Sequence, residues 1–404
     1  MNRYLLPSLI LTGTLAGCAT SLPQPAQPVS APVASTPAEA IILPPAEIEA
    51  PTPPVVVPTP TAPKPVVITE QQGRQILDKT LPPRIADRKG WSTDIFNAFK
   101  YLKLPYTREN FCAVNAVIEQ ESSWQSDPGV PNLPAIVWGK IAEKAHRYLI
   151  PLPVVKAGLM KTSPNGKSYK ERIDHLRTER EMNDLFEDMN SEAKKLGLPA
   201  EKSNPIRTGG PMQVSVEFAT AHVQVWPYPY PRRSIRQEVF TRRGGVYFGS
   251  AILLQYPAPY TQMLYRFADF NAGRYSSRNA AFQAAVEKLG GRRLSLDGDL
   301  LSYQNGRPAA STTEQALLAL AGRLGMSSGE IQRDLKLEKF AGFSQTTLYR
   351  KVFALADQRL GRPAPRAILP QIDLKSPKIT RKLTTEWFAK RVEGRYETCL
   401  ARSR

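Results

Sequence analysis

A long proline-rich segment separates the part of this chain that can bury a hydrophobic core from the part that cannot. From Ala19 to about Val67 the sequence is dominated by Pro, Ala, Val, Thr and Ser, with no aromatic residue and almost no positive charge. Such a composition cannot bury enough apolar surface to offset the loss of conformational entropy on folding. We therefore expect a disordered linker over residues 19–67 and a folded part over residues 68–404.

The N-terminal segment predicts export and a lipid anchor. Met1 to Cys18 carries a basic residue at Arg3, a short apolar run and then Leu-Ala-Gly immediately before the cysteine. The run is too short to span a bilayer, so it indicates a signal peptide. The pattern resembles the bacterial lipoprotein signal, which implies that Cys18 is lipidated and becomes the first mature residue. A chance cysteine in an ordinary signal peptide is the alternative. Ala19 is typical of outer-membrane sorting, and we expect an anchor at the periplasmic face.

The folded part shows mainly helical patterns. Apolar residues recur every three to four positions, which is typical of helices with one buried face. Alternating patterns are rare, and a short hairpin around Arg293–Gln304 is the best candidate for strands. The sequence thus predicts a mainly α fold. Helices are expected near Asp94–Tyr101, Cys112–Ser122, Glu171–Leu196, Met212–Val225, Gly245–Gln255, Tyr260–Asn271, Ser276–Leu289, Thr312–Leu324 and Thr346–Leu360.

One of these helices carries a candidate general acid. Val114, Val117 and Ile118 share a helical face, and Glu121 continues that face one turn later. Burial disfavours the charged form of a carboxylate, so a Glu on this side can keep its proton near neutral pH. Glu119, two positions earlier, points to roughly the opposite face and is interpreted as structural. A capped or solvated carboxylate at a helix end is the alternative reading of Glu121.

Three later motifs give this glutamate a context. The sequence Glu121-Ser122 is followed by Gly210-Pro211-Met212-Gln213, by Tyr247-Phe248-Gly249 and by Phe270-Asn271-Ala272-Gly273. The ordered set resembles the lytic transglycosylases, which share a fold with goose-type lysozyme and carry Glu-Ser, Gly-Leu-Met-Gln and Tyr-Asn-Ala-Gly in the same order. The resemblance implies a lysozyme-like helical domain that binds peptidoglycan glycan strands.

Site residues follow from the resemblance position by position. Glu121 matches the single catalytic acid/base, and Ser122 beside it helps to shape the substrate cleft. Met212 matches the cleft wall and Gln213 the amide that hydrogen-bonds the sugar. Asn271 matches the asparagine of the last motif.

Two positions depart from the family pattern. Phe270, in the substrate-binding motif, replaces a tyrosine, and Pro211 replaces a leucine. These changes leave open a catalytically degenerate lipoprotein that only binds peptidoglycan. A hydrolytic muramidase is a further alternative, for which Asp127 or Asp269 could supply the second carboxylate.

The reaction implied by the family consumes no water. Glu121 protonates the oxygen between N-acetylmuramic acid and N-acetylglucosamine, and the muramic 6-hydroxyl then closes a 1,6-anhydro ring. No cofactor is expected. His146, His175 and His222 show no metal-binding spacing, so we expect no metal site.

The folded part is longer than a simple family member. We expect a catalytic domain over residues 68–290 with an insertion at about 125–208, and a C-terminal helical extension over 291–404 that packs on it. In the insertion and after it, aromatic side chains are candidates for sugar stacking, although core packing is the commoner role; these are Trp124, Trp138, Trp226, Tyr228 and Tyr230. Gly342–Arg350 has a superficial helix-turn-helix look, but export argues against nucleic acid as a partner.

Charge and cysteine count complete the expectations. The chain has 54 Lys and Arg against 36 Asp and Glu, a formal net charge of +18. A basic surface attracts the carboxylates of peptidoglycan stem peptides and anionic membrane headgroups. With Cys18 assigned to lipid, Cys112 and Cys399 remain as an even pair in an oxidising compartment. We therefore predict a disulfide between them, with two buried thiols as the alternative.

Overall fold

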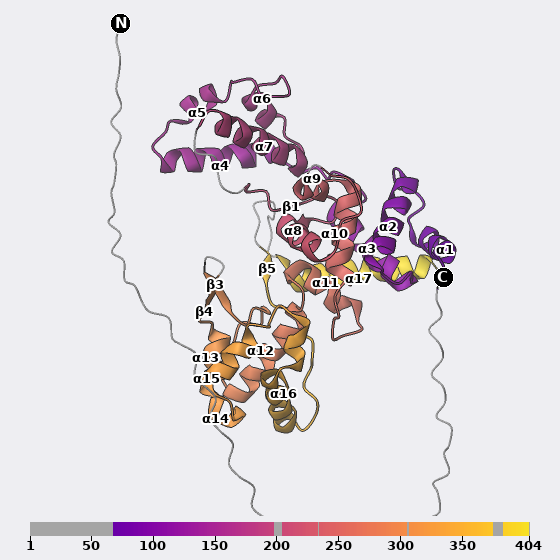
Figure 1. The fold of residues 1–404 in the computed structure, drawn as a ribbon, viewed down its shortest axis with the longest axis vertical. Coiled ribbons are helices and arrows are strands. Elements are labelled where there is room, and N and C mark those ends of the chain that lie inside the picture. Colours follow the sequence, from indigo (N-terminus) through magenta and orange to yellow (C-terminus); the bar gives the residue numbers. More distant parts are fainter. Residues whose placement is uncertain (1–67, 198–203, 233, 305–306, 375–382, 404) are drawn as a thin grey trace, which may run out of the picture. The chain divides into compact units, whose positions relative to one another are not determined.

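The computed structural model describes residues 68–197, 204–232, 234–304, 307–374 and 383–403 (Figure 1). The predicted signal segment, Cys18 and the linker lie outside the described residues. Within those ranges the fold is mainly helical, as the apolar periodicity predicts, and the strands form short antiparallel pairs. Across the same ranges, every helix is too short or too polar to cross a bilayer.

The elements follow one another along the chain in the order shown in Figure 1. The helices are α1 (Glu70–Thr80), α2 (Arg88–Leu102), α3 (Arg108–Ser122), α4 (Leu133–Arg147), α5 (Leu152–Gly158), α6 (Tyr169–Asp174), α7 (Glu179–Lys195), α8 (Val216–Val225), α9 (Ile235–Val239), α10 (Arg242–Leu254), α11 (Met263–Ala272), α12 (Ser276–Gly290), α13 (Thr312–Ala319), α14 (Ala321–Leu324), α15 (Ser328–Leu335), the 3₁₀ turn η1 (Ala341–Gln345), α16 (Thr347–Leu360) and α17 (Thr385–Arg402). The strands pair as β1 (Thr208–Gly209) with β2 (Val214–Ser215), β3 (Ser302–Gln304) with β4 (Arg307–Ala309), and β5 (Asp373–Leu374) with β6 (Leu383–Thr384).

Helix α3 is enclosed by its neighbours. Every residue from Phe111 to Ile118 is buried, and α1, α10 and α17 pack against the helix. A helix that is buried on all sides over two turns belongs inside a core. The surrounding cluster is built from α1–α3, α8–α11 and α17 with their connecting segments, and we call it the central core. The central core thus surrounds the helix that carries Glu121 near its C-terminal end.

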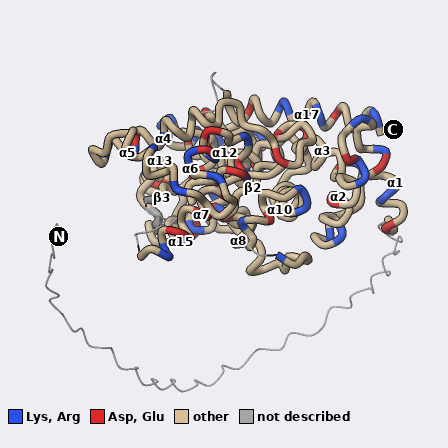
Figure 2. Tube along the Cα trace, turned by 90° about the horizontal axis from the view of Figure 1, so that it is seen from above, with Lys and Arg blue, Asp and Glu red and all other residues tan. Residues whose placement is uncertain are grey.

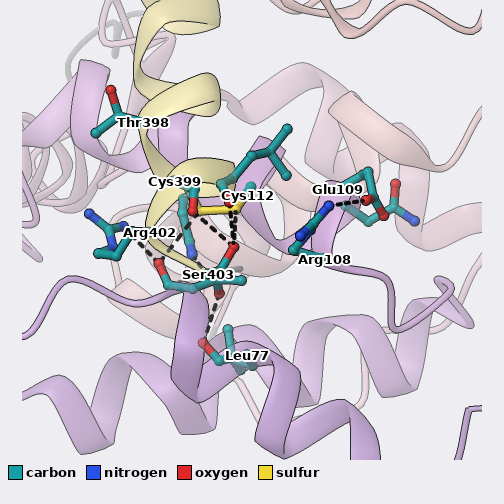
Figure 3. Close-up of a disulfide and its surroundings, with 12 residues drawn as sticks. Leu77, Arg108, Glu109, Cys112, Thr398, Cys399, Arg402 and Ser403 are labelled. Carbon is teal, nitrogen blue, oxygen red and sulfur yellow. Dashed lines mark hydrogen bonds and ion pairs between the residues drawn. A yellow bond between two sulfur atoms is a disulfide. The ribbon is translucent and has the colours of Figure 1, made fainter.

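Helix α17 reaches the central core from the far end of the chain. It packs along α3 and α11, and Phe388, Ala389 and Val392 are buried there. Cys399 forms a disulfide with Cys112 at the start of α3, across 287 residues of sequence (Figure 3). The disulfide that the cysteine count predicts is therefore present. Closing so long a loop removes unfolded-state entropy worth roughly 5 kcal/mol.

A second hydrophobic cluster forms between α12 and α16. Its buried residues come from α12, α13, α15, α16 and the connections between them. The segment with a helix-turn-helix look belongs to this cluster, since Phe343, Leu348 and Tyr349 are buried in it. The segment therefore turns its apolar side chains inward and packs as ordinary core.

The insertion after α3 contributes helices α4 to α7 around a small third cluster. Tyr169, Ile173 and Leu185 are buried there, with Trp138 packed against them. The single helix expected over Glu171–Leu196 is wrong, because α6 ends at Asp174 and α7 begins at Glu179. Thr178 interrupts the run: its backbone is extended and its side chain caps α7 in a capping box.

The segment at Met212 also differs from expectation. A helix was predicted from Met212 onward, but α8 begins only at Val216, after a hairpin in which Gly209 pairs with Val214. Gly210 and Gln213 have φ values of 72° and 49°, in the left-handed region that a right-handed helix excludes. Residues 210–213 are therefore the turn of a β-hairpin.

Candidate active site

Glu121 lies in the last turn of α3, where the fully buried part of that helix ends. Its side chain is half-buried, while Ile118 one turn earlier is fully buried. Ser122 is buried, and its hydroxyl donates a 2.8 Å hydrogen bond to the carbonyl of Ile118. The Ser122 side chain thus binds to the last turn of α3. The carboxylate of Glu121 lies at the rim of the central core.

The backbone after Glu121 turns through an unusual conformation. Ser123 and Trp124 have φ values of 48° and 64°, so two successive residues with side chains are left-handed. Each such residue costs on the order of 1 kcal/mol and persists only where the surroundings impose it. Here Trp124 is buried edge-on against Trp91, with ring centroids 5.3 Å apart. Trp124 is therefore a core anchor for this turn, which is the commoner of the two roles considered for the aromatic residues.

The hairpin turn at 210–213 packs on α10. A Cβ atom added at Gly249 would lie 2.4 Å from the Met212 sulfur, and one at Gly245 would lie 2.6 Å from Pro211 Cδ. The Tyr-Phe-Gly motif thus contributes a glycine that lets the turn approach the helix. Met212 is fully buried in this contact, so its assignment to the substrate-facing wall is wrong.

Gln213 is the half-exposed residue of that turn. Its amide nitrogen donates a 2.9 Å hydrogen bond to Glu179 Oε2 and a longer one, 3.4 Å, to the carbonyl of Gly210. Met212 and Val214 on either side of Gln213 are fully buried in the core. The left-handed backbone of Gln213 directs its own side chain toward α7 instead. Gln213 is therefore placed to present its amide oxygen.

Glu179 is a residue that the motifs did not reveal. It stands in the first turn of α7, which is anchored at several points. Thr178 donates a 3.1 Å hydrogen bond to Asp127, and Arg180 donates to the carbonyl of Phe240 over 2.7 Å. The start of α7 therefore contacts the segment after α3, the hairpin turn and the segment before α10. The capping box Thr178–Glu181 is the sequence signal that could have placed Glu179 at a helix start.

The two rival carboxylates for a hydrolytic mechanism have different surroundings. Burial raises the pKa of Asp127, while Arg180, 3.5 Å away, and Thr178 oppose that shift. Asp269 is almost fully buried and accepts hydrogen bonds from the backbone N–H groups of Tyr275 and Ser277 at the start of α12. Burial likewise raises the pKa of Asp269. Asp269 therefore holds the α11–α12 junction together and is no candidate for contact with substrate.

The last motif is linked to α17. Asn271 is exposed, and its amide oxygen accepts a 2.9 Å hydrogen bond from the hydroxyl of Thr385 in the first turn of α17. Phe270 is half-buried against the central core. The amides of Gln213 and Asn271 thus hydrogen-bond to different elements, α7 and α17.

Glu119 lies on the side of α3 that faces α17. Its carboxylate lies 3.9 Å from Arg395 Nε, in an ion pair that leaves both groups partly exposed. A pocket of about 380 Å³ opens beside this pair, lined by Glu119, Lys390, Arg391, Gly394, Arg395 and Thr398. Basic residues recur along α17 in Figure 2. The structural role expected of Glu119 is consistent with this contact.

Three of the four remaining aromatic candidates are held by specific partners. The Trp138 indole donates to Asp174 over 2.9 Å, and the Trp226 indole donates to the carbonyl of Tyr101 over 3.0 Å. Tyr228 is buried, and its hydroxyl donates a 2.7 Å hydrogen bond to Glu238. These contacts account for the positions of the three rings within the fold.

The histidines were considered as possible metal ligands, and His222 is the buried one among them. The ring of His222 lies against Gln255, 2.7 Å away, and burial lowers its pKa. In the part of the chain that the structure describes, no three His, Cys, Asp or Glu side chains are grouped to hold a metal ion.

Comparison with known proteins places the chain in a family. An uncharacterized protein, YaiW of Escherichia coli K12, is 47% identical over 325 residues, which cover 80% of this chain and 88% of the relative. No solved structure matches this one. The family model described as a protein of unknown function, DUF1615, matches residues 84–402. Because that match spans α3, the hairpin turn and α17 alike, the chain belongs to the DUF1615 family.

Proposed function

We propose that this chain is a peptidoglycan-cleaving lipoprotein of the outer membrane, with a lysozyme-like helical domain in which Glu121 is the catalytic acid/base. The observation that carries the proposal is the construction around Glu121. A half-buried glutamate stands one residue before the end of a helix that the core encloses, and two left-handed residues follow that helix. Backbone strain of this kind concentrates at functional sites.

The hairpin turn supports the same site. Gly210–Gln213 packs on α10 through Gly249, and α10 also packs against α3. Two of the sequence motifs that resemble lytic transglycosylases thus meet on a helix that also contacts the glutamate-bearing helix. Because both hydrogens of the Gln213 amide are directed to Glu179 and Gly210, its oxygen remains to accept a bond from a sugar hydroxyl or acetamido N–H.

The proposed chemistry uses one carboxyl group twice. The protonated Glu121 gives its proton to the glycosidic oxygen, and the bond from that oxygen to muramic C1 breaks. The resulting carboxylate then takes the proton of the muramic 6-hydroxyl, whose oxygen bonds to C1. The products are a 1,6-anhydromuramic end and a new N-acetylglucosamine hydroxyl, with Glu121 protonated again. A group that serves both steps needs a pKa near the working pH.

A binding-only lipoprotein is the second candidate. Phe270 lacks the hydroxyl that the family tyrosine would supply, and the Asn271 amide oxygen is already bonded to Thr385. Both features weaken the third motif as a source of catalytic hydrogen bonds. Such a protein would retain the cleft and bind glycan without turnover.

Digestion of purified sacculi distinguishes these functions. The wild-type protein is incubated with sacculi, and the soluble products are separated and weighed by mass spectrometry. We expect muropeptides with 1,6-anhydro ends, and their loss in Glu121→Gln. Glu119→Gln is the matched control, since it removes a carboxylate from the same helix on the α17 side.

Each other outcome selects an alternative. Reducing muramic ends would replace the transglycosylase proposal with a hydrolase, for which Asp127 is the remaining predicted carboxylate. Binding to sacculi without soluble products would select the binding-only lipoprotein. Full activity in Glu121→Gln would remove Glu121 from the mechanism.

A further inference from the structure

Several large apolar side chains are exposed within a short stretch of chain that runs from the end of α4 to just after α5. Tyr148, Leu149, Ile150, Val154 and Met160 are all exposed, and Leu149 is the extreme case at 88%. We call these five residues the apolar tip. Single exposed apolar residues are common on protein surfaces, but a cluster of this kind indicates a surface that another molecule covers.

The tip is held in place by its backbone. The N–H of Ile150 bonds to the carbonyl of Ala145 over 2.9 Å, and that of Leu149 to the carbonyl of His146 over 3.0 Å. This is a Schellman motif, in which the residue that corresponds to Leu149 is usually glycine because its backbone is left-handed. Leu149 has a φ of 57°. A leucine here costs conformational energy and gains no burial, so folding alone does not account for it.

The following segment is equally constrained. Pro151 precedes α5 and Pro153 stands in its first turn, which fixes two φ angles beside the tip. Below the tip, the half-buried residues Ile141 and Leu159 pack on the third cluster. The exposed side chains are therefore displayed on a supported surface.

Basic residues surround the tip. Between residues 140 and 161 the chain carries five Lys or Arg side chains and a single acidic one, Glu143. Glu143 pairs with Lys140 and Arg147, and Lys161 pairs with Glu192 from α7. The cations are Lys140, Lys144, Arg147, Lys156 and Lys161. The local charge thus favours an anionic partner.

We propose that the apolar tip docks the insertion onto a phospholipid bilayer that contains anionic phosphatidylglycerol. Leu149, Ile150 and Val154 enter the boundary between headgroups and acyl chains, and Tyr148 lies at the level of the headgroups, where amphipathic rings collect. Lys144, Arg147 and Lys156 contact the lipid phosphates. Apolar area and basic charge together are the combination that interfacial membrane segments use. This inference is independent of glycan cleavage.

The test uses the mature chain with Cys18→Ser, so that no acyl chain contributes to binding. The protein is mixed with vesicles of phosphatidylglycerol and phosphatidylethanolamine, or of phosphatidylcholine alone, and sedimented. We expect binding to the anionic vesicles that weakens as salt rises, and little binding to phosphatidylcholine. The double change Leu149→Ser, Ile150→Ser should weaken binding at least about tenfold, because two aliphatic side chains no longer leave water.

Two further variants make the assignment specific. Val225→Ser is the matched control, since Val225 is 82% exposed but lies outside the tip. A fluorescent reporter measures insertion directly: Leu149→Cys supplies one free thiol, because Cys112 and Cys399 are bonded to each other. An environment-sensitive label on that thiol should shift to the blue with anionic vesicles, and the same label on Val225→Cys should not.

Three results would overturn the proposal. Wild-type protein that ignores anionic vesicles would point to a protein partner for the tip. Binding that the double variant retains in full would show that charge alone attracts the chain. A label at position 149 that stays in water while the protein is bound to vesicles would also show that charge alone attracts the chain. This measurement does not depend on the folding of the double variant.

Discussion

The side-chain amide of Gln213 donates a 2.9 Å hydrogen bond to the carboxylate of Glu179, and this bond joins the hairpin turn to the first turn of α7. Gln213 comes from the Gly-Pro-Met-Gln segment, and Glu179 comes from the insertion that precedes it. The insertion is therefore attached at the candidate site itself. Glu179 thereby has a testable role, which is to position the side-chain amide of Gln213.

Removal of the Glu179 carboxylate should disorder the Gln213 amide. We expect Glu179→Ala to raise the apparent KM for glycan about tenfold with a smaller effect on kcat, because a hydrogen bond to a charged group is worth about 1.5 kcal/mol or more. Glu179→Gln should restore most of the loss, since a glutamine oxygen can accept the same bond. Glu171→Gln, an exposed change elsewhere in the insertion, serves as control. An equal loss in the Ala and Gln variants would show that Glu179 acts by charge and not by positioning Gln213.

The contact between Gly249 and Met212 should not tolerate a methyl group. Gly249→Ala places a Cβ atom 2.4 Å from the Met212 sulfur, so the hairpin turn must shift. We expect a loss of about 1–3 kcal/mol in the free energy of unfolding, measured by urea denaturation. The added change Met212→Ala makes room for the methyl group, so the double variant should lose less than the sum of the two single losses. Strict additivity would mean that the two side chains do not share this space.

The buried group around Glu238 gives a pH dependence. Burial alone would raise the pKa of Glu238, but hydrogen bonds from Arg243 and Tyr228 outweigh it and lower the pKa below 4.5. The folded state thus binds this proton less readily than the unfolded state. The stabilisation is fully present above about pH 4.5 and is lost as the pH falls through the folded-state pKa.

Glu238→Gln should therefore cost more at neutral pH than in acid. We expect a loss of about 1.5 kcal/mol in the free energy of unfolding at pH 7, since the change weakens a charge-assisted hydrogen bond to Arg243, whose side chain is partly exposed and so remains partly solvated. The difference from wild type should shrink at pH 3. Urea unfolding at both pH values measures it, with the exposed Glu217→Gln as control. A difference that grows toward low pH would contradict the assigned direction of the pKa shift.

The disulfide should stabilise the site as well as the fold. Replacing Cys112 and Cys399 together with alanine removes the link between α3 and α17, and we expect a loss of about 3–5 kcal/mol. The melting temperature of the wild-type protein should fall after reduction. The melting temperature of the double variant should not change on reduction. Equal melting temperatures with and without reductant in the wild-type protein would mean that the bond is absent in solution.

Several elements could be predicted because their information is local. α3, α12 and α16 each have apolar residues at helical spacing over several turns, and the periodicity identified all three. α4 begins with a proline in its first turn and is not among the expected helices. α17 was not among the expected helices, since its buried residues stand among many charges and depend on α3 and α11 for burial.

The site was predicted only in part, for a similar reason. The place of Glu121 at the rim of the central core follows from the spacing of α3 alone. The burial of Met212 could not be predicted, because it depends on a glycine of α10 that lies 37 residues away in the chain. Glu179 was missed because its pairing with Gln213 joins two segments that share no pattern.

The bond between Cys112 and Cys399 also has a consequence for biosynthesis. The helix that carries Glu121 acquires its final neighbour only after another 287 residues of chain have been made. A nascent or truncated polypeptide without α17 would leave one side of that helix in water. Assembly of the glutamate's surroundings is thus deferred until late in translation, and its covalent completion requires oxidising conditions.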